Sequence, residues 1–84
     1  KGGYKMYTQV VNPIEMEFTE KSKLIFSASK NNKTEEVYVD IRIHVNSERY
    51  SGPTKKGITF PVDRIEEVQE KLKELNDMLI AKGY

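Results

Sequence analysis

Six basic side chains in the middle of the sequence can hold a polyanion, and three flat side chains lie among them. The cations are Lys30, Lys33, Arg42, Arg49, Lys55 and Lys56, and the flat groups are Tyr38, His44 and Tyr50. Binding of single-stranded nucleic acid without sequence preference needs cations along the phosphate track and planar groups on which bases stack. Arg42 can serve both purposes, because its guanidinium is planar as well as charged. These nine residues predict a nucleic-acid-binding surface. The alternative is ordinary surface charge with rings that cover the sheet.

The segment Ser51–Pro61 concentrates these features. It contains Gly52-Pro53, the lysine pair Lys55-Lys56 and a second glycine. Glycine permits positive φ, and proline has no N–H to give to a β-ladder. We therefore expect Gly52-Pro53 to stop one strand, and the two lysines to stand at the rim of a short last strand over 57–60. Their alternative role is to make a loop soluble.

No set of side chains in the sequence predicts catalysis or a metal site. His44 is the only histidine, and there is no cysteine. No serine or acid has a spacing that indicates a catalytic triad, and the carboxylates form no metal-ligating motif. The run Gly52–Gly57 is superficially similar to a phosphate-binding loop, but it lacks the Gly-Lys-Ser/Thr ending. We therefore predict a protein that is not an enzyme and needs no cofactor or metal.

The charges are distributed unevenly along the chain, although the net charge is only +1. Residues 20–56 contain eight basic and five acidic side chains, whereas residues 61–82 contain four basic and six acidic ones. A molecule polarised in this way can present one face to a polyanion while the other stays solvated.

Alternating hydrophobic residues predict a sheet. Residues 1–13 form an arm or edge strand that ends at Asn12-Pro13, and three strands are expected over 14–19, 23–30 and 36–45, with a loop over 30–34. The strongest pattern is in 36–45, where five β-branched residues alternate with polar ones. Tyr38, Arg42 and His44 then share a face with Ser27 and Ser29, and we expect this face to be open.

One long helix is expected from about Pro61 onwards. Proline is favoured in a first helical turn, and Gly83 is a typical C-cap. A single apolar stripe runs along this segment: Ile65, Val68, Leu72, Leu75 and Leu79. The order predicts an α+β fold, a curved four-stranded antiparallel sheet followed by a helix that covers one face. Residues 14–84 would form this single domain.

A chain of 84 residues buries only about 60% of its unfolded surface, so its own core is thin. Without disulfides or a metal, a second copy of the chain is the simplest reinforcement. We therefore expect a homodimer that packs through the helix stripe. There is no run of about 20 apolar residues, so no membrane span is expected.

Two segments of the chain resemble the transcriptional positive cofactor four family of single-stranded-DNA-binding coactivators, which includes bacterial and phage relatives. They are Val39-Asp40-Ile41-Arg42 and Gly52-Pro53-Thr54-Lys55-Lys56-Gly57-Ile58-Thr59, followed by the long helix. The resemblance covers about residues 16–80. It implies a curved four-stranded sheet with a terminal helix, and a homodimer whose sheets form channels for single-stranded DNA or unpaired duplex.

The resemblance also assigns residues. Arg42 takes the place of the family's strand arginine, Lys55 and Lys56 that of its basic pair, and Lys30 and Lys33 correspond loosely to its basic hairpin. His44-Val45 stands where the family has an aromatic residue. A milder resemblance links the chain to Pur-type nucleic-acid-binding domains.

The sequence thus predicts a homodimer that binds single-stranded DNA or RNA without strong sequence preference, in transcription, replication or recombination. Its partners would be the nucleic acid, itself, and transcription or replication proteins. The expected location is the cytoplasm or nucleoid in a bacterium or virus, and the nucleus in a eukaryote. The alternative is a protein-interaction module that docks a partner on the helix stripe.

Overall fold

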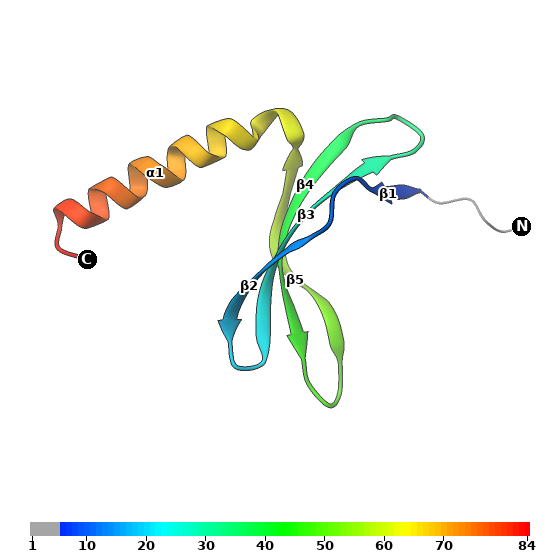
Figure 1. The fold of residues 1–84 in the computed structure, drawn as a ribbon, viewed down its shortest axis with the longest axis horizontal. Coiled ribbons are helices and arrows are strands. Elements are labelled where there is room, and N and C mark those ends of the chain that lie inside the picture. The colour runs from blue at the N-terminus through cyan, green and yellow to red at the C-terminus, as the bar shows by residue number, and fades with distance from the viewer. Residues whose placement is uncertain (1–5) are drawn as a thin grey trace, which may run out of the picture.

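The computed structural model describes residues 6–84 (Figure 1). The first five residues of the predicted N-terminal arm lie outside this range. The elements follow one another as β1 (Tyr7–Gln9), β2 (Ile14–Thr19), β3 (Ser22–Asn31), β4 (Val37–Asn46), β5 (Ser51–Pro61), the 3₁₀ turn η1 (Val62–Arg64) and α1 (Ile65–Ala81). An antiparallel sheet followed by one C-terminal helix is an α+β fold, as the sequence predicted.

The sheet is built around β3. Both β1 and β2 pair with the same edge of β3, one at each end, and β4 and β5 follow on its other side. The predicted arm therefore contributes a short strand, with Tyr7 opposite Asn31. Every pairing is antiparallel, and the strands cross in a strong twist (Figure 1).

The register separates two faces as the alternation predicted. Phe26 lies opposite Ile41 and Ala28 opposite Val39 on the apolar face. On the other face, Ser27 lies opposite Asp40 and Ile25 opposite Arg42. We call this second surface the open face, because most of its side chains are polar and α1 does not lie on it.

The prediction that Gly52-Pro53 ends a strand is wrong. β5 runs without interruption from Ser51 through both residues, and the turn lies earlier, at 47–50. Proline is tolerated here because β5 is an edge strand that pairs only with β4. Gly52 has φ of +141°, which side-chain-bearing residues rarely adopt. The two lysines consequently lie inside a strand and not in a loop.

The predicted loop over 30–34 lies later in the chain, over 32–36, because β3 continues to Asn31 and β4 begins at Val37. The Asn31 side chain closes the turn that follows. Its Oδ1 accepts hydrogen bonds from the backbone N–H groups of Lys33, at 2.8 Å, and Thr34, at 3.1 Å. Glu35 in this turn has a positive φ of 67°.

The helix ends as predicted at Gly83. Tyr84 N–H donates to the carbonyl of Leu79 at 3.0 Å, and Gly83 N–H donates to that of Ile80 at 2.9 Å. This pair of bonds is a Schellman motif, and the φ of +94° at Gly83 explains why glycine suits the position.

The helix does not cover the sheet, which corrects the sequence prediction. α1 starts beside β5 and then runs away from the strands (Figure 1). The radius of gyration is 15.9 Å, whereas a compact domain of this length has about 12 Å. Among the described residues, Val39 is the only buried hydrophobic one, at 7% exposure. The chain folds two surfaces that face each other but are too far apart to close over a core.

Candidate nucleic-acid interface

Among residues 6–84, Arg42 is the side chain of the open face that donates the most hydrogen bonds. Its Nε and Nη2 hold the carboxylate of Asp40, with Nη2 at 2.8 Å from Oδ1. Its Nη1 donates to the backbone carbonyl of Thr54 at 3.0 Å. The Thr59 hydroxyl donates to Asp40 Oδ1 at 2.7 Å. A guanidinium bound in this forked way is held in place, so Arg42 links β4 to β5 and does not extend into solvent as a free cation.

The same contacts shift the pKa values of Asp40 and Arg42. Partial burial alone would raise the pKa of Asp40, but the hydrogen bonds from Arg42 and Thr59 and the charge of Arg42 outweigh it, so the pKa is lowered. The hydrogen bond to Asp40 raises the pKa of Arg42. Both groups therefore stay charged at neutral pH.

The lysine pair sits on a β-bulge. Arg42 pairs with Gly57 and His44 pairs with Pro53, so Ile43 alone faces the three residues 54–56. Thr54 fastens this bulge, because its hydroxyl donates to the Ile43 carbonyl at 2.8 Å and accepts the N–H of Lys56 at 3.1 Å. Bulges re-aim side chains at sheet edges.

Gly57 closes the bulge by letting two strands approach. A Cβ at this position would lie 2.6 Å from the Ile41 carbonyl oxygen and 2.9 Å from the Cα of Arg42. Only glycine fits without moving the backbone, which explains why it follows the lysines directly.

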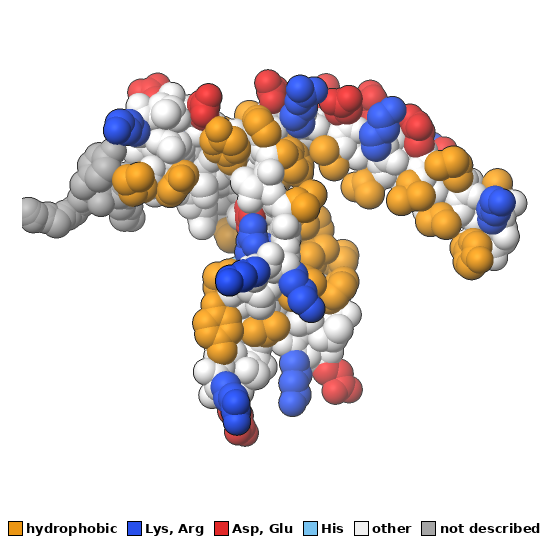
Figure 2. Space-filling model, turned by 180° about the vertical axis from the view of Figure 1, so that it is seen from behind, with side chains coloured by type: hydrophobic (Ala, Val, Ile, Leu, Met, Phe, Trp, Pro, Cys, Tyr) orange, Lys and Arg blue, Asp and Glu red, His pale blue; other side chains and the backbone are white. Residues whose placement is uncertain are grey.

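The two lysines do not form one cluster. Lys56 borders a hollow of about 410 Å³ together with Phe18, Lys21, Ile43 and Val45. Ile43 and Val45 belong to the apolar face, so Lys56 joins Lys21 there. The Lys55 side chain is exposed and makes no hydrogen bond or ion pair with any of residues 6–84. Figure 2 shows lysine and arginine side chains spread along the strand region beneath the helix.

The remaining predicted cations are dispersed. Lys30 lies opposite Val37, so it shares the apolar face and not the open face. Lys33 and Arg49 are exposed at the tips of two hairpins. His44 lies on the open face, opposite Lys23 of β3.

The predicted aromatic residues differ in where their rings lie and in which groups their hydroxyls bind. The Tyr50 hydroxyl donates to the Pro53 carbonyl, so its ring folds back over Gly52 and the hairpin. Tyr38 stays on the open face, where its hydroxyl donates to Glu36 at 2.7 Å. This hydrogen bond and the charge of Glu36 raise the pKa of Tyr38.

Sequence reasoning missed an acidic strip on the open face. Glu15 lies opposite Ile25 and Glu17 opposite Lys23, which places both carboxylates there. Lys23 Nζ binds Glu15 at 2.8 Å. This bond lowers the pKa of Glu15 and raises that of Lys23. The sequence shows that Glu15 and Glu17 alternate with apolar residues, but it does not indicate which strand β2 pairs with.

Residues 6–84 contain no group of three or more side chains able to hold a metal ion. Over the same range, no helix is long and apolar enough to cross a membrane.

A twisted antiparallel sheet with one polar face, followed by a terminal helix, is an α+β fold. Comparison with family models specifies the family: residues 20–71 match Transcriptional Coactivator p15 (PC4). The match covers more than half of the 84 residues, so the chain belongs to this family of DNA-binding transcription coactivators. No curated protein and no solved structure matches the chain.

Proposed function

We propose that the protein binds single-stranded DNA or RNA without strong sequence preference, as a homodimer acting in transcription, replication or recombination. The observation that supports this most is the bulge in β5, where Thr54 and Gly57 position Lys55 and Lys56 within a segment that matches a DNA-binding family. A nuclear or nucleoid location follows from the same proposal.

The charges of the described residues support a role for β5 and the hairpin tips in this binding. Arg42, Lys23 and the helix lysines 71 and 73 are already paired with carboxylates. The basic side chains without an ion pair within the described residues are Lys21, Lys30, Lys33, Arg49, Lys55, Lys56 and Lys82. A phosphate that binds one of these side chains displaces only water, so these cations cost least to engage. Lys33, Arg49, Lys55 and Lys56 are the exposed ones on β5 and on the tips of the β3–β4 and β4–β5 hairpins.

The dimer part of the proposal rests on uncovered apolar surface. Leu72 is 59% exposed and Leu75 is 49% exposed, although both lie on the side of α1 turned toward the sheet. Figure 2 shows hydrophobic side chains along that side of the helix, with charged ones on the opposite side. Monomeric proteins rarely leave so continuous an apolar stripe in water.

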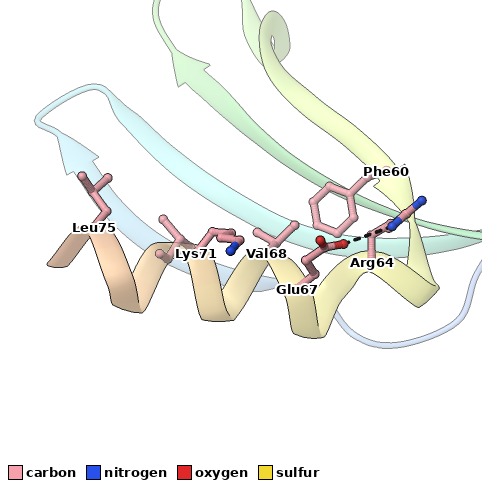
Figure 3. A pocket seen from close by; sticks show the side chains of 7 residues that line it. Phe60, Arg64, Glu67, Val68, Lys71 and Leu75 are labelled. Carbon is pink, nitrogen blue, oxygen red and sulfur yellow. Dashed lines mark hydrogen bonds and ion pairs between the residues drawn. The ribbon is translucent and has the colours of Figure 1, made fainter. Parts of the chain in front are cut away.

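The space between helix and sheet has room for a partner. A groove of about 550 Å³ runs from Phe60 past Val68 and Leu72 to Leu75 (Figure 3). At its rim, Arg64 binds Glu67 at 3.0 Å. A second copy is the proposed occupant, because the same helix stripe placed about a two-fold axis would fill each groove with the partner's leucines. A bound protein of another kind is the rival interpretation.

Nucleic-acid binding is tested by fluorescence anisotropy with labelled oligo-dT and with duplex DNA at several salt concentrations. We expect oligo-dT to bind more tightly than duplex. The variant Lys55→Ala/Lys56→Ala should weaken binding and reduce the salt slope by about 1.4, because each phosphate contact to a single strand contributes about 0.7. Lys71→Ala/Lys73→Ala removes the same charge from the helix and serves as the matched control.

Two results would contradict the proposal. One is equal affinity for oligo-dT and duplex at every salt concentration. The other is an equal loss of affinity in the strand variant and in the helix control, which would indicate that net charge alone matters.

The dimer is tested separately by light scattering. Wild-type protein should have twice the monomer mass of 9.7 kDa, and Leu72→Glu/Leu75→Glu should convert it to the monomer or unfold it. A wild-type monomer at micromolar concentration would refute the dimer. It would favour the protein-interaction module, in which a different partner covers α1.

A further inference from the structure

The open face contains a cleft that was not predicted from the sequence, and Tyr38 is the one member of the nine predicted site residues that lines it. It has a volume of about 540 Å³ and lies at the end of the sheet nearest the β3–β4 turn. Its lining comes from four strands: Tyr7 of β1, Ser29 and Asn31 of β3, Tyr38 and Asp40 of β4, and Thr59 of β5. The volume is within the range of small-molecule sites.

Two tyrosine rings flank this cleft. Tyr7 pairs with Asn31, and Tyr38 pairs with Ser29, so one strand separates the rings. Neighbouring strands are about 4.8 Å apart, which places the two tyrosine backbones at least about 9 to 10 Å apart. Tyr7 is 56% exposed and its ring is accessible. A planar group can therefore enter and contact one or both rings.

Most polar groups that line the cleft already have hydrogen-bond or ion-pair partners. The carboxylate of Asp40 is fully engaged by Arg42 and by the hydroxyl of Thr59. Asn31 Oδ1 accepts two backbone N–H groups of the turn, which leaves the Nδ2 amide as its free donor. The Ser29 side chain makes no hydrogen bond within the described part of the chain, residues 6–84, so its hydroxyl is available there as well.

The charges around the cleft disfavour an anionic occupant. Arg42 neutralises Asp40, whereas Glu36, which accepts the hydrogen bond of Tyr38, has no ion pair within residues 6–84. A phosphate or a carboxylate would be repelled by this carboxylate. A nucleobase is neutral, flat and edged with hydrogen-bonding groups. It is the part of a nucleotide that suits two rings, an amide donor and a hydroxyl.

Given the proposed binding of single strands, on which this inference rests, we propose that the Tyr7–Tyr38 cleft is a subsite that holds one unpaired nucleobase. The base stacks on a tyrosine ring, and its edge faces Ser29 and Asn31. Lys33, at the tip of the β3–β4 hairpin next to the cleft, and Lys55 of β5 are the cations that would hold the flanking phosphates, while this cleft holds the base.

Tyr7 adds to the subsite a side chain from outside the part of the chain that matches the family. It lies outside residues 20–71, the part that matches the family. It reaches the open face only because β1 joins the edge of β3. The chain carries His44-Val45 where the family has an aromatic residue, and the cleft supplies two aromatic rings in another place.

The experiment compares oligo-dT with an abasic oligonucleotide of the same length, which keeps the phosphates and lacks the bases. Base stacking on one aromatic side chain strengthens binding roughly fivefold to a hundredfold. Wild-type protein should bind oligo-dT more tightly than the abasic strand by a factor in this range. Tyr7→Leu should lose most of that preference, and Tyr7→Phe should retain it. The matched control is Tyr84→Leu, a tyrosine at the end of the helix that is 89% exposed.

Each outcome decides the inference. If wild-type protein binds both strands equally, or if Tyr7→Leu keeps the full preference, the nucleobase subsite is refuted while backbone binding stands. If neither strand binds, the proposed function fails first. Far-UV circular dichroism and urea unfolding show whether Tyr7→Leu is folded. If it is not, intrinsic tyrosine fluorescence of the wild-type protein decides: because the chain has no tryptophan, oligo-dT should quench it and the abasic strand should not.

Discussion

The substitution Gly57→Ala tests whether the bulge in β5 depends on close approach of the strands. The added methyl would lie 2.6 Å from the Ile41 carbonyl oxygen, whereas ordinary contacts begin at 3.4 Å, so the overlap is 3.4 − 2.6 = 0.8 Å. The nearest atoms are backbone atoms of β4, which cannot rotate away. Overpacking of this kind costs about 1–3 kcal/mol. The whole protein is expected to be stable by about 4–13 kcal/mol, from 0.05–0.15 kcal/mol per residue.

We expect Gly57→Ala to lower the free energy of unfolding by about 1–3 kcal/mol in urea denaturation followed by circular dichroism. Affinity for oligo-dT should fall as well, because the lysines of the bulge move with β5. Gly83→Ala is the matched control: a Cβ there meets no atom within 4 Å, and only the positive φ is strained, at about 1 kcal/mol. It should leave oligo-dT binding unchanged. The reasoning is refuted if Gly57→Ala unfolds within 0.5 kcal/mol of wild type and binds oligo-dT equally well.

Two further outcomes follow from the Arg42 network, and a third follows from the bulge. Asp40→Asn should destabilise the protein by about 1–3 kcal/mol in urea, because it leaves the half-buried guanidinium without its counter-charge. Because folding lowers the pKa of Asp40, its contribution is complete above the unfolded pKa and is lost as the pH falls through the folded one. Wild-type stability should thus decline below about pH 4, and more steeply than that of Asp40→Asn. Thr54→Val should cost about 1 kcal/mol in urea unfolding, because the Ile43 carbonyl and the Lys56 N–H lose a partner; no change would show that the bulge holds without the hydroxyl.

The strand alternation was predictable because burial on one face requires apolar residues at every second position. Val39 and Ile41 therefore indicated a face, and Gly83 indicated where the helix ends. These signals are local: each depends on backbone geometry within a few residues. The fold class and the family segment followed from them.

The course of β5 was not predictable from local signals. Gly52-Pro53 normally interrupts a strand, and only an edge position next to β4 accommodates it. The same pairing made Arg42 a link between strands, because it brings Thr54 and Thr59 of β5 to a guanidinium that already lies beside Asp40 on β4. Sequence spacing indicates the contact with Asp40 but not those with β5.

By itself, the sequence determined the two faces of the sheet and the helix stripe, because residue type and periodicity express these directly. Only the tertiary structure decided which side chains share a site. It placed Lys30 on the apolar face, separated Lys56 from Lys55, and brought Tyr7 to Tyr38. The physical reason is register: pairing between strands sets which side chains are neighbours, and a bulge of a few residues redirects them.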